Sequence, residues 1–252
     1  MAPSLIVRLP PRGYQVVYLG IVDIVIASLQ HEAEARSYES VFENVGGESD
    51  DEFRTQSRVT SSGAVGELRR GLLDNTSYIN SAWTPRAFSY LRSLRGGNEQ
   101  EPHQNYPPSV LEAQRPKGHI PASMIFAFQE NTKLKVFEGC FAVRDDSKAR
   151  VIDIPVGFCV IFRGDLIHCG ASYSSTNYRI HCYLAFKGMS WKPDIVSSVL
   201  PKTFDCQYCG LRMVESNKRR KHRRFCIKNR RSAENKKKRK RENDPLPMEK
   251  LV

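Results

Sequence analysis

The strongest constraint on the fold of this chain lies between residues 150 and 186, where two apolar runs flank a turn. Residues 157–162 and 180–186 have the length and the β-branched and aromatic content of buried strands. Gly164 and Asp165 follow the first run and are typical of a tight turn. The segment therefore predicts two strands of a β-rich core.

Two further strands are predicted upstream. Residues 121–129 are mostly apolar, and residues 132–139 alternate apolar residues with lysines, as expected of a half-buried strand. His168 follows the Gly-Asp turn, and Arg179 opens the last run eleven residues later. This order of strand, turn, histidine and strand-borne arginine resembles the C-terminal half of the Fe(II)/2-oxoglutarate dioxygenases, whose core is a double-stranded β-helix.

The resemblance implies an iron site. In that family the histidine after the turn is the distal iron ligand and the arginine pairs with the far carboxylate of 2-oxoglutarate, which assigns these roles to His168 and Arg179. A His-x-Asp or His-x-Glu pair is expected upstream, and the sequence offers His103 and Asn105. Residues i and i+2 of a strand share one face, so both can reach one metal and His168 completes a facial triad. Asn105 departs from the pattern, because a neutral amide is a weaker donor than a carboxylate.

Three more polar residues are predicted to contact the cosubstrate. His181 shares a strand face with Arg179, and Tyr173 and Asn177 lie between His168 and Arg179. His119 is an alternative iron ligand, although its proline-rich loop setting disfavours it. The opposing hypothesis is a metal-free, cupin-like barrel in which the histidines are ordinary polar residues.

The rest of the N-terminal half is less regular. Residues 14–29 are predicted as strand or helix, and residues 30–45 as an amphipathic helix. Residues 46–63 are polar and Ser-rich, which predicts a flexible loop. Residues 64–94 carry two apolar clusters that predict helices flanking the barrel, and residues 107–121 are expected to form a loop over the pocket mouth.

The charge of the chain is concentrated near its C-terminus. The formal net charge is +12, yet residues 202–241 hold 17 Lys and Arg against 3 Asp and Glu, so the remainder is about −2. A near-neutral body with a strongly basic segment predicts a polyanionic partner for that segment alone.

The cysteines indicate a reducing compartment, and the hydropathy of the N-terminal stretch argues against a membrane span. Three of the seven cysteines have a metal-type spacing, and the other four lie in or beside strand-like runs, where buried thiols are expected. The apolar stretch at residues 14–29 is interrupted by Asp23 and is too short for a membrane span. We therefore predict neither secretion nor membrane association.

Cys206, Cys209, His222 and Cys226 have the spacing of a ββα zinc finger with cysteine in place of the last histidine. Phe204 and Met213 stand where that family places core residues. Arg219 stands where leucine is usual, so the apolar core is thin and Zn(II) must supply most of the folding free energy.

The helix of this finger is basic. By the family's alignment, Glu215, Lys218 and Lys221 project toward bases, whereas other cationic residues contact phosphates. The phosphate-contacting set comprises Arg219, Arg220, Arg223 and Arg224. A single finger reads about three base pairs, so sequence specificity is low. DNA, RNA and protein all stay open as partners.

Residues 228–241 contain two basic clusters, which resemble a bipartite nuclear import signal. The second cluster, sufficient as a monopartite signal, consists of Lys236, Lys237, Lys238, Arg239, Lys240 and Arg241. We therefore predict an import receptor as a partner and the nucleus as the location; a merely solvated tail is the alternative.

Together these patterns predict a mainly β chain with flanking α-helices: a jelly-roll-like double-stranded β-helix barrel plus a small ββα zinc finger. The expected organisation is a helical and flexible region at 1–97, the barrel core at 98–190, the finger at 203–230 and a basic disordered tail at 228–252. The predicted function is a nuclear Fe(II)/2-oxoglutarate-dependent oxygenase of hydroxylase type, tethered to nucleic acid by the finger. The alternative is an inactive barrel serving as a binding module. The sequence gives no indication of oligomeric state.

Overall fold

The computed structural model describes residues 9–41, 52–194, 197–199 and 202–229. The chain divides into two compact units. The first contains the described residues up to Val199 except 145–147, and the second contains residues 145–147 and those from 202 onward. Within the described residues, no helix is long and apolar enough to cross a membrane.

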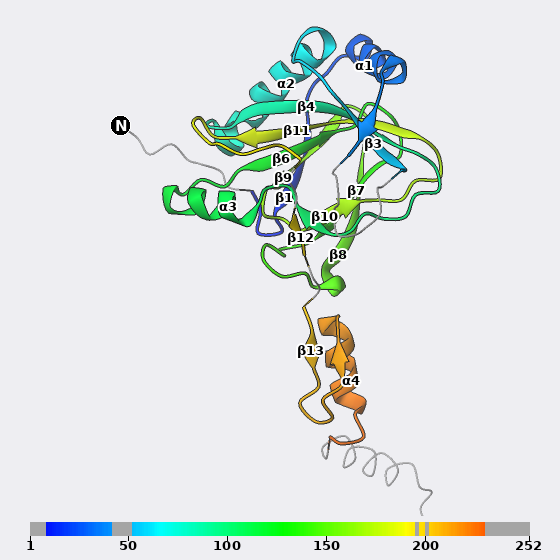
Figure 1. Ribbon diagram of the computed structural model, residues 1–252, viewed down its shortest axis with the longest axis vertical. Coiled ribbons are helices and arrows are strands. Elements are labelled where there is room, and N and C mark those ends of the chain that lie inside the picture. The colour runs from blue at the N-terminus through cyan, green and yellow to red at the C-terminus, as the bar shows by residue number, and fades with distance from the viewer. Residues whose placement is uncertain (1–8, 42–51, 195–196, 200–201, 230–252) are drawn as a thin grey trace, which may run out of the picture. The chain divides into compact units, whose positions relative to one another are not determined.

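A seven-stranded antiparallel sheet forms the larger wall of the first unit (Figure 1). Its strands, in spatial order, are β1 (Tyr14–Tyr18), β9 (Phe158–Arg163), β6 (Ala122–Phe126), β11 (Asn177–Ala185), β4 (Thr84–Ser93), β3 (Arg54–Arg58) and β2 (Glu39–Ser40). The three most apolar runs of the sequence, predicted as strands, therefore lie side by side as β9, β6 and β11 at its centre.

A five-stranded antiparallel sheet forms the second wall. Its strands, in spatial order, are β12 (Ser197–Ser198), β5 (His103–Gln104), β10 (His168–Gly170), β7 (Thr132–Phe137) and β8 (Ala149–Ile154). The two sheets give the mainly β barrel that the sequence predicts. The predicted strand at residues 132–139 is confirmed as β7.

The period of two along the central strands builds two cores. On β9, Cys159 and Ile161 pack in a cluster with the helices α1 (Asp23–Ala35) and α2 (Gly63–Asn80), whereas Val160 and Phe162 pack between the sheets against β7 and β8. Both faces of β9 are covered, and its residues before Arg163 are all apolar, as expected for a strand buried on both sides. Val160 and Phe162 lie on the face of β9 that also borders the pocket described below.

Several predictions about the N-terminal half are wrong. The helix expected over 30–45 ends at Ala35 and is followed by β2, and the loop expected over 46–63 contains β3; residues 42–51 lie outside the described part. β3 is polar, but it pairs with β2 and β4 along its length, so sheet context overrides its low strand propensity.

The second helix expected within residues 64–94 is the strand β4. Its pairing with β11 shifts between Ser89 and Arg86, where Ala87 adopts a φ of 53°. This bulge interrupts the alternation of inward and outward side chains along β4. The spacing of its apolar residues therefore resembles that of a helix. Strands β1 to β4 thus place the N-terminal residues in the same compact unit as the barrel.

The loop expected over 107–121 is also partly wrong. It contains the helix α3 (Pro108–Gln114) and a 3-10 turn at Arg115–Lys117. Pro108 begins α3, where its missing N–H and fixed φ cost nothing. The prolines therefore start a helix here instead of excluding one.

The tight turn at Gly164 lies against the barrel wall. A Cβ atom at this position would come within 2.4 Å of the Tyr106 ring and 3.0 Å of the Pro121 carbonyl oxygen. Tyr106 is fully buried, so the ring has no room to withdraw. Glycine is required here by close approach, and the turn is thereby fixed just ahead of His168.

The second unit has a short hairpin of β13 (Phe204–Asp205) and β14 (Arg212–Met213), followed by α4 (Ser216–Phe225). It also includes the 3-10 turn at Asp146–Lys148 in part. No residue of α4 is buried.

Candidate functional site

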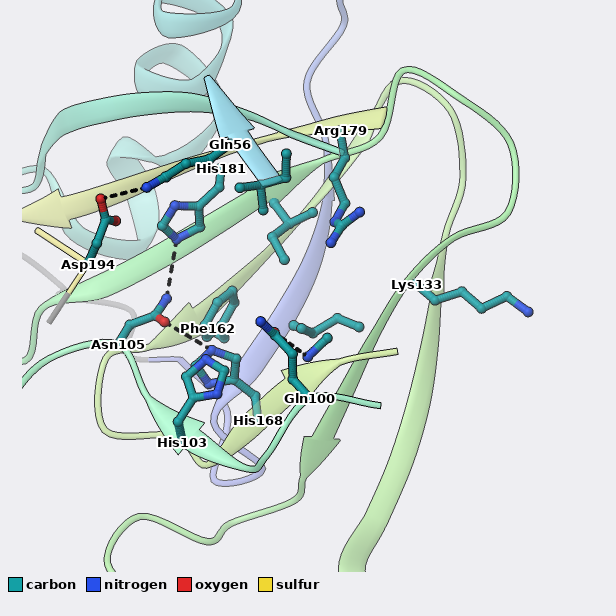
Figure 2. A pocket seen from close by; sticks show the side chains of 14 residues that line it. Gln56, Gln100, His103, Asn105, Lys133, Phe162, His168, Arg179, His181 and Asp194 are labelled. Atoms are coloured by element: carbon teal, nitrogen blue, oxygen red, sulfur yellow. Dashed lines mark hydrogen bonds between the residues drawn. The ribbon is translucent and has the colours of Figure 1, made fainter. Parts of the chain in front are cut away.

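A pocket between the two sheets brings together His103, His168 and His181 (Figure 2). His103 on β5 and His168 on β10 are direct partners across the antiparallel pair, and their ring centroids are 4.7 Å apart. Both side chains are buried. The turn at Gly164 and the pairing of β5 with β10 therefore bring together two residues that are far apart in sequence.

Backbone carbonyl groups fix both imidazoles. The Nδ1 atom of His103 lies 2.8 Å from the Glu101 carbonyl oxygen, and Nδ1 of His168 lies 2.8 Å from that of Leu166. Burial lowers the pKa of His103 to about 4 and that of His168 well below its usual range, so both rings are neutral at physiological pH. A neutral ring that donates from Nδ1 carries its lone pair on Nε2.

Asn105 completes the group. Its Oδ1 lies 3.1 Å from Nε2 of His168, and its Nδ2 donates to Ser123 Oγ at 2.8 Å and to His181 Nε2 at 3.2 Å. The predicted trio of His103, Asn105 and His168 thus lies around one point of the pocket. The Oδ1 and Nε2 atoms both present lone pairs, and the proton of His168 is already donated to Leu166.

Two facing lone pairs are the arrangement expected of ligands that share a cation. Adjacent ligands of an octahedral metal, with bonds of about 2.1 Å, are about 3 Å apart. The observed separation of 3.1 Å matches that spacing. Two imidazoles and one oxygen are also the donor types of a non-haem Fe(II) facial triad. The residues present therefore fit a divalent metal, with an amide oxygen in the carboxylate position.

Arg179 lies in the same pocket on β11. Its side chain is buried, and its Nη1 donates to Ser93 Oγ at 3.0 Å and to Asn177 Oδ1 at 3.5 Å. Its Nε has no hydrogen-bond acceptor, and no carboxylate among the described residues forms an ion pair with it. Burial lowers the pKa of its guanidinium. A buried cation with an unsatisfied donor is costly unless an anion binds it.

Three solved structures resemble this chain at low sequence identity. AviO1 from Streptomyces viridochromogenes Tue57 aligns over 72% of the chain and 93% of its own length, with 16% identity and a TM-score of 0.52. A prolyl-4-hydroxylase from Pseudomonas putida aligns over 70% and 94%, with 11% identity and a TM-score of 0.51. HygX from Streptomyces hygroscopicus, solved with nickel and 2-oxoglutarate, aligns over 72% and 86%, with 8% identity and a TM-score of 0.51.

The barrel has the fold of the 2-oxoglutarate-dependent oxygenases. The sequence itself matches no protein-family model and no curated protein. The likeness is therefore one of three-dimensional structure, and the expected double-stranded β-helix is supported.

The predicted cosubstrate contacts separate into two groups. His181 lines the pocket, whereas Tyr173 and Asn177 lie behind Arg179. The Tyr173 ring lies 5.2 Å from the Arg179 guanidinium, and its hydroxyl is bonded to the backbone of Lys133. These two residues therefore hold the arginine in place.

His119, the alternative ligand, is outside the pocket. Its ring stacks on Phe186 with a centroid distance of 4.1 Å, and Nδ1 lies 3.4 Å from Gln114 Oε1. The stacking accounts for this histidine as a packing residue.

Sequence reasoning missed several residues of the pocket. Ser123 and Ser93 bond the key side chains, and Gln56, Gln100 and Asp194 line the cavity. Ser123 is two positions before Ile125 on β6, so the alternation of that strand indicates which way it faces. Ser93 and Gln56 depend on register between strands far apart in sequence, and Gln100 and Asp194 lie outside the strands, so none of them has a local signal.

The second unit contains a separate cluster. One potential ligand atom from each of Cys206, Cys209, His222 and Cys226 lies within 4.8 Å of the others, and Cys209 Sγ is 3.2 Å from His222 Nε2. Although desolvation raises it, hydrogen bonds from the backbone of Tyr208 and Cys209 bring the pKa of Cys206 down to about 6. The cluster can therefore hold a metal ion such as zinc.

The structure also places the predicted contact residues of α4. Lys218 forms an ion pair with Glu215, so two of the three predicted base-facing side chains pair with each other. The Arg219 guanidinium lies 5.1 Å from the Phe204 ring, where its cation–π contact replaces the usual leucine. The remaining cationic residues of the predicted contact set line hollows of the surface; these are Lys221, Arg220, Arg223 and Arg224. The import cluster Lys236–Arg241, like the rest of the tail from 230, lies outside the described residues.

Proposed function

We propose that the barrel is an Fe(II)/2-oxoglutarate-dependent oxygenase of hydroxylase type. The observation that carries the proposal is the buried Arg179, which has no carboxylate partner among the described residues and lies in the same pocket as the facing lone pairs of Asn105 and His168. A ligand pair of metal and carboxylate would satisfy both of these groups at once. The fold shared with known 2-oxoglutarate oxygenases supports this choice.

In this proposal each side chain has a distinct role. His103, Asn105 and His168 would hold the iron, and Arg179 would take the far carboxylate of 2-oxoglutarate. When bound, iron and 2-oxoglutarate supply the oxidising chemistry, with succinate and carbon dioxide as the products of the cosubstrate. The carbonyl groups of Glu101 and Leu166 keep the two imidazoles in the ligating tautomer. Ser123 and His181 bind the Asn105 nitrogen and so keep its oxygen turned toward His168.

The test is conversion of 2-oxoglutarate to succinate by the full chain, reconstituted anaerobically with Fe(II) and then exposed to oxygen. We expect slow succinate release that depends on iron and falls to background in His168→Ala. His119→Ala, outside the pocket, should release succinate like wild type and serves as the matched control. No release and no iron bound at the barrel would favour the alternative, an inactive barrel that acts as a binding module.

For the second unit we propose a zinc finger that binds nucleic acid. Its support is the Cys3His cluster beside a helix in which six of the ten residues are Lys or Arg. The pairing of Lys218 with Glu215 reduces the number of side chains available to read bases, which favours phosphate contacts over sequence recognition. DNA and RNA share the chemistry of the phosphate backbone.

The triple variant Arg220→Gln, Arg223→Gln, Arg224→Gln tests this second proposal. We expect weaker binding of the full chain to duplex DNA or single-stranded RNA. On duplex DNA, the salt dependence of log K should become shallower by about 0.9 for each phosphate that the variant no longer neutralises. Fluorescence anisotropy at several salt concentrations measures both effects.

Arg150→Gln, a substitution of an exposed arginine of the barrel, is the control for this experiment. It should bind nucleic acid with the affinity and the salt dependence of wild type. Equal affinities and slopes for wild type and the triple variant would rule out the proposed interface on α4.

We further propose nuclear import through Lys236–Arg241 and an import receptor. The support is the composition of this basic cluster. Replacing its six residues by alanine in a fluorescent fusion should redistribute the protein from the nucleus to the cytoplasm.

A further inference from the structure

The metal ligands of this pocket carry no charge. His103 and His168 are neutral imidazoles, and Asn105 contributes an amide oxygen. A carboxylate in the third position would cancel one of the two positive charges of a divalent metal, whereas the amide cancels none. Arg179 adds a further buried positive charge to the same pocket.

The other charged residues of the pocket wall do not offset this excess. Lys133 points away from the ligand group in Figure 2, and its Nζ lies 3.8 Å from Asp153. Asp194 is the acidic residue among those that line the cavity, and its carboxylate already pairs with Arg58 and accepts a hydrogen bond from Gln56. Within the described residues, the pocket therefore has a strong excess of positive charge once a metal is bound.

Two hydrogen bonds orient the amide of Asn105. Ser123 Oγ and His181 Nε2 both accept hydrogen bonds from Nδ2 of Asn105, which leaves Oδ1 directed at His168 (Figure 2). In this orientation the Asn105 oxygen and the His168 lone pair face each other, and a metal ion between them would be held by both atoms. Ser123 and His181 are thus positioning residues for the third ligand.

We infer that the metal and a dicarboxylate dianion bind this pocket with strong mutual cooperativity, an inference that rests on the proposed function. The dianion brings the two negative charges that the protein ligands lack, and it contacts the metal and Arg179 from one pocket. Each ligand alone must enter a buried site of unbalanced charge, which is unfavourable. Together they neutralise each other, so each increases the affinity of the other by the same factor.

Mn(II) is the appropriate probe, because it prefers oxygen and imidazole donors over the thiolates of the Cys3His cluster. We would titrate the full chain with Mn(II) under argon, with and without 2-oxoglutarate, and follow unbound Mn(II) by electron paramagnetic resonance. For wild type we expect weak binding that tightens by about 100-fold with 2-oxoglutarate, near the upper end of typical coupling. His168→Ala should abolish the dependence and identifies the site.

Asn105→Asp is the decisive comparison. The Ser123 hydroxyl can donate to a carboxylate and His181 can present an N–H, so the same partners accommodate aspartate. We expect this variant to bind Mn(II) more tightly than wild type without 2-oxoglutarate, and to gain only about 10-fold or less when it is added. A thermal melt checks that the variant is folded.

The outcomes separate this inference from the proposed function. Mn(II) binding to wild type that ignores 2-oxoglutarate, or that gains as little as in Asn105→Asp, would overturn the cooperativity and leave the oxygenase proposal standing. The absence of His168-dependent Mn(II) binding in both proteins, with and without 2-oxoglutarate, would overturn the oxygenase proposal as well.

Discussion

We expect Arg179→Met to weaken 2-oxoglutarate binding by at least about 30-fold without lowering the stability of the barrel. Truncating one partner of a buried, hydrogen-bonded charge pair costs about 2–5 kcal/mol of binding free energy, and about 2 kcal/mol corresponds to that factor. The proposed partner of Arg179 is the far carboxylate of the ligand. Methionine retains the length of the side chain but offers no donor to it.

Most substitutions of buried residues lower the free energy of unfolding, but Arg179→Met should not. In the protein without its ligand, Arg179 is a desolvated cation that has no carboxylate partner among the described residues. Replacing a buried charge by an apolar side chain of similar volume is often neutral or stabilising. The free energy of unfolding should therefore stay the same or rise, apart from the loss of the hydrogen bonds to Ser93 and Asn177.

Isothermal titration calorimetry with Mn(II) and 2-oxoglutarate measures the first effect, and urea denaturation measures the second. Arg150→Met is the matched control, since its side chain is 58% exposed and lies on β8. If Arg179→Met binds 2-oxoglutarate as wild type does, the carboxylate site is elsewhere. A large loss of stability would instead identify Arg179 as a structural residue.

Removal of the metal from the second unit should unfold that unit and leave the barrel intact. The buried residues of the described finger segment are Phe204, Cys206 and Cys226, and α4 contributes none. So small an apolar core cannot offset the conformational entropy of folding. Binding of structural zinc supplies about 10–16 kcal/mol at neutral pH in peptides of this kind, so its loss should unfold the segment.

Cys209→Ser and a zinc chelator provide independent tests. Both should collapse the amide chemical shifts of residues 202–229 to random-coil values in nuclear magnetic resonance spectra, while the barrel resonances remain dispersed. Gln207→Ala, an exposed position in the same turn, should retain about one zinc per chain and the folded spectrum. A segment that stays folded after the metal is removed would contradict the proposed structural zinc.

The sequence was most informative where local patterns and tertiary structure agree. Strands β6, β9 and the second half of β11 were predictable because both of their faces are covered, which makes them apolar at most positions. Strands β3 and β4 were not, since β3 is polar and the bulge at Ala87 disrupts the alternation of β4. Their strand conformation depends on neighbours that no local window contains.

The pocket divides in the same way. His103 and Asn105 were found because a spacing of two places side chains on one strand face, and His168 because a turn precedes it. Ser93 could not be found, and the alternation of β6 gives only the face of Ser123, since each serine reaches its partner across strand pairs set by register. The charge excess of the pocket also depends on the lack of a carboxylate partner for Arg179 among the described residues, which is seen only in the folded chain.

The short strand β12 has a practical consequence for dissecting this protein. Its backbone pairs with His103 and Gln104, and the Val199 N–H donates to the Pro102 carbonyl, so β12 forms the outer border of the sheet at β5. A fragment that stops at residue 190, where the sequence suggested a boundary, would expose the hydrogen-bonding groups of β5 to solvent and to other chains. Such an open edge invites intermolecular pairing and loosens β5, the strand that carries His103. Truncation experiments on the barrel should therefore retain the chain through Val199, because a shorter fragment could lose the proposed metal site through a distorted β5 alone.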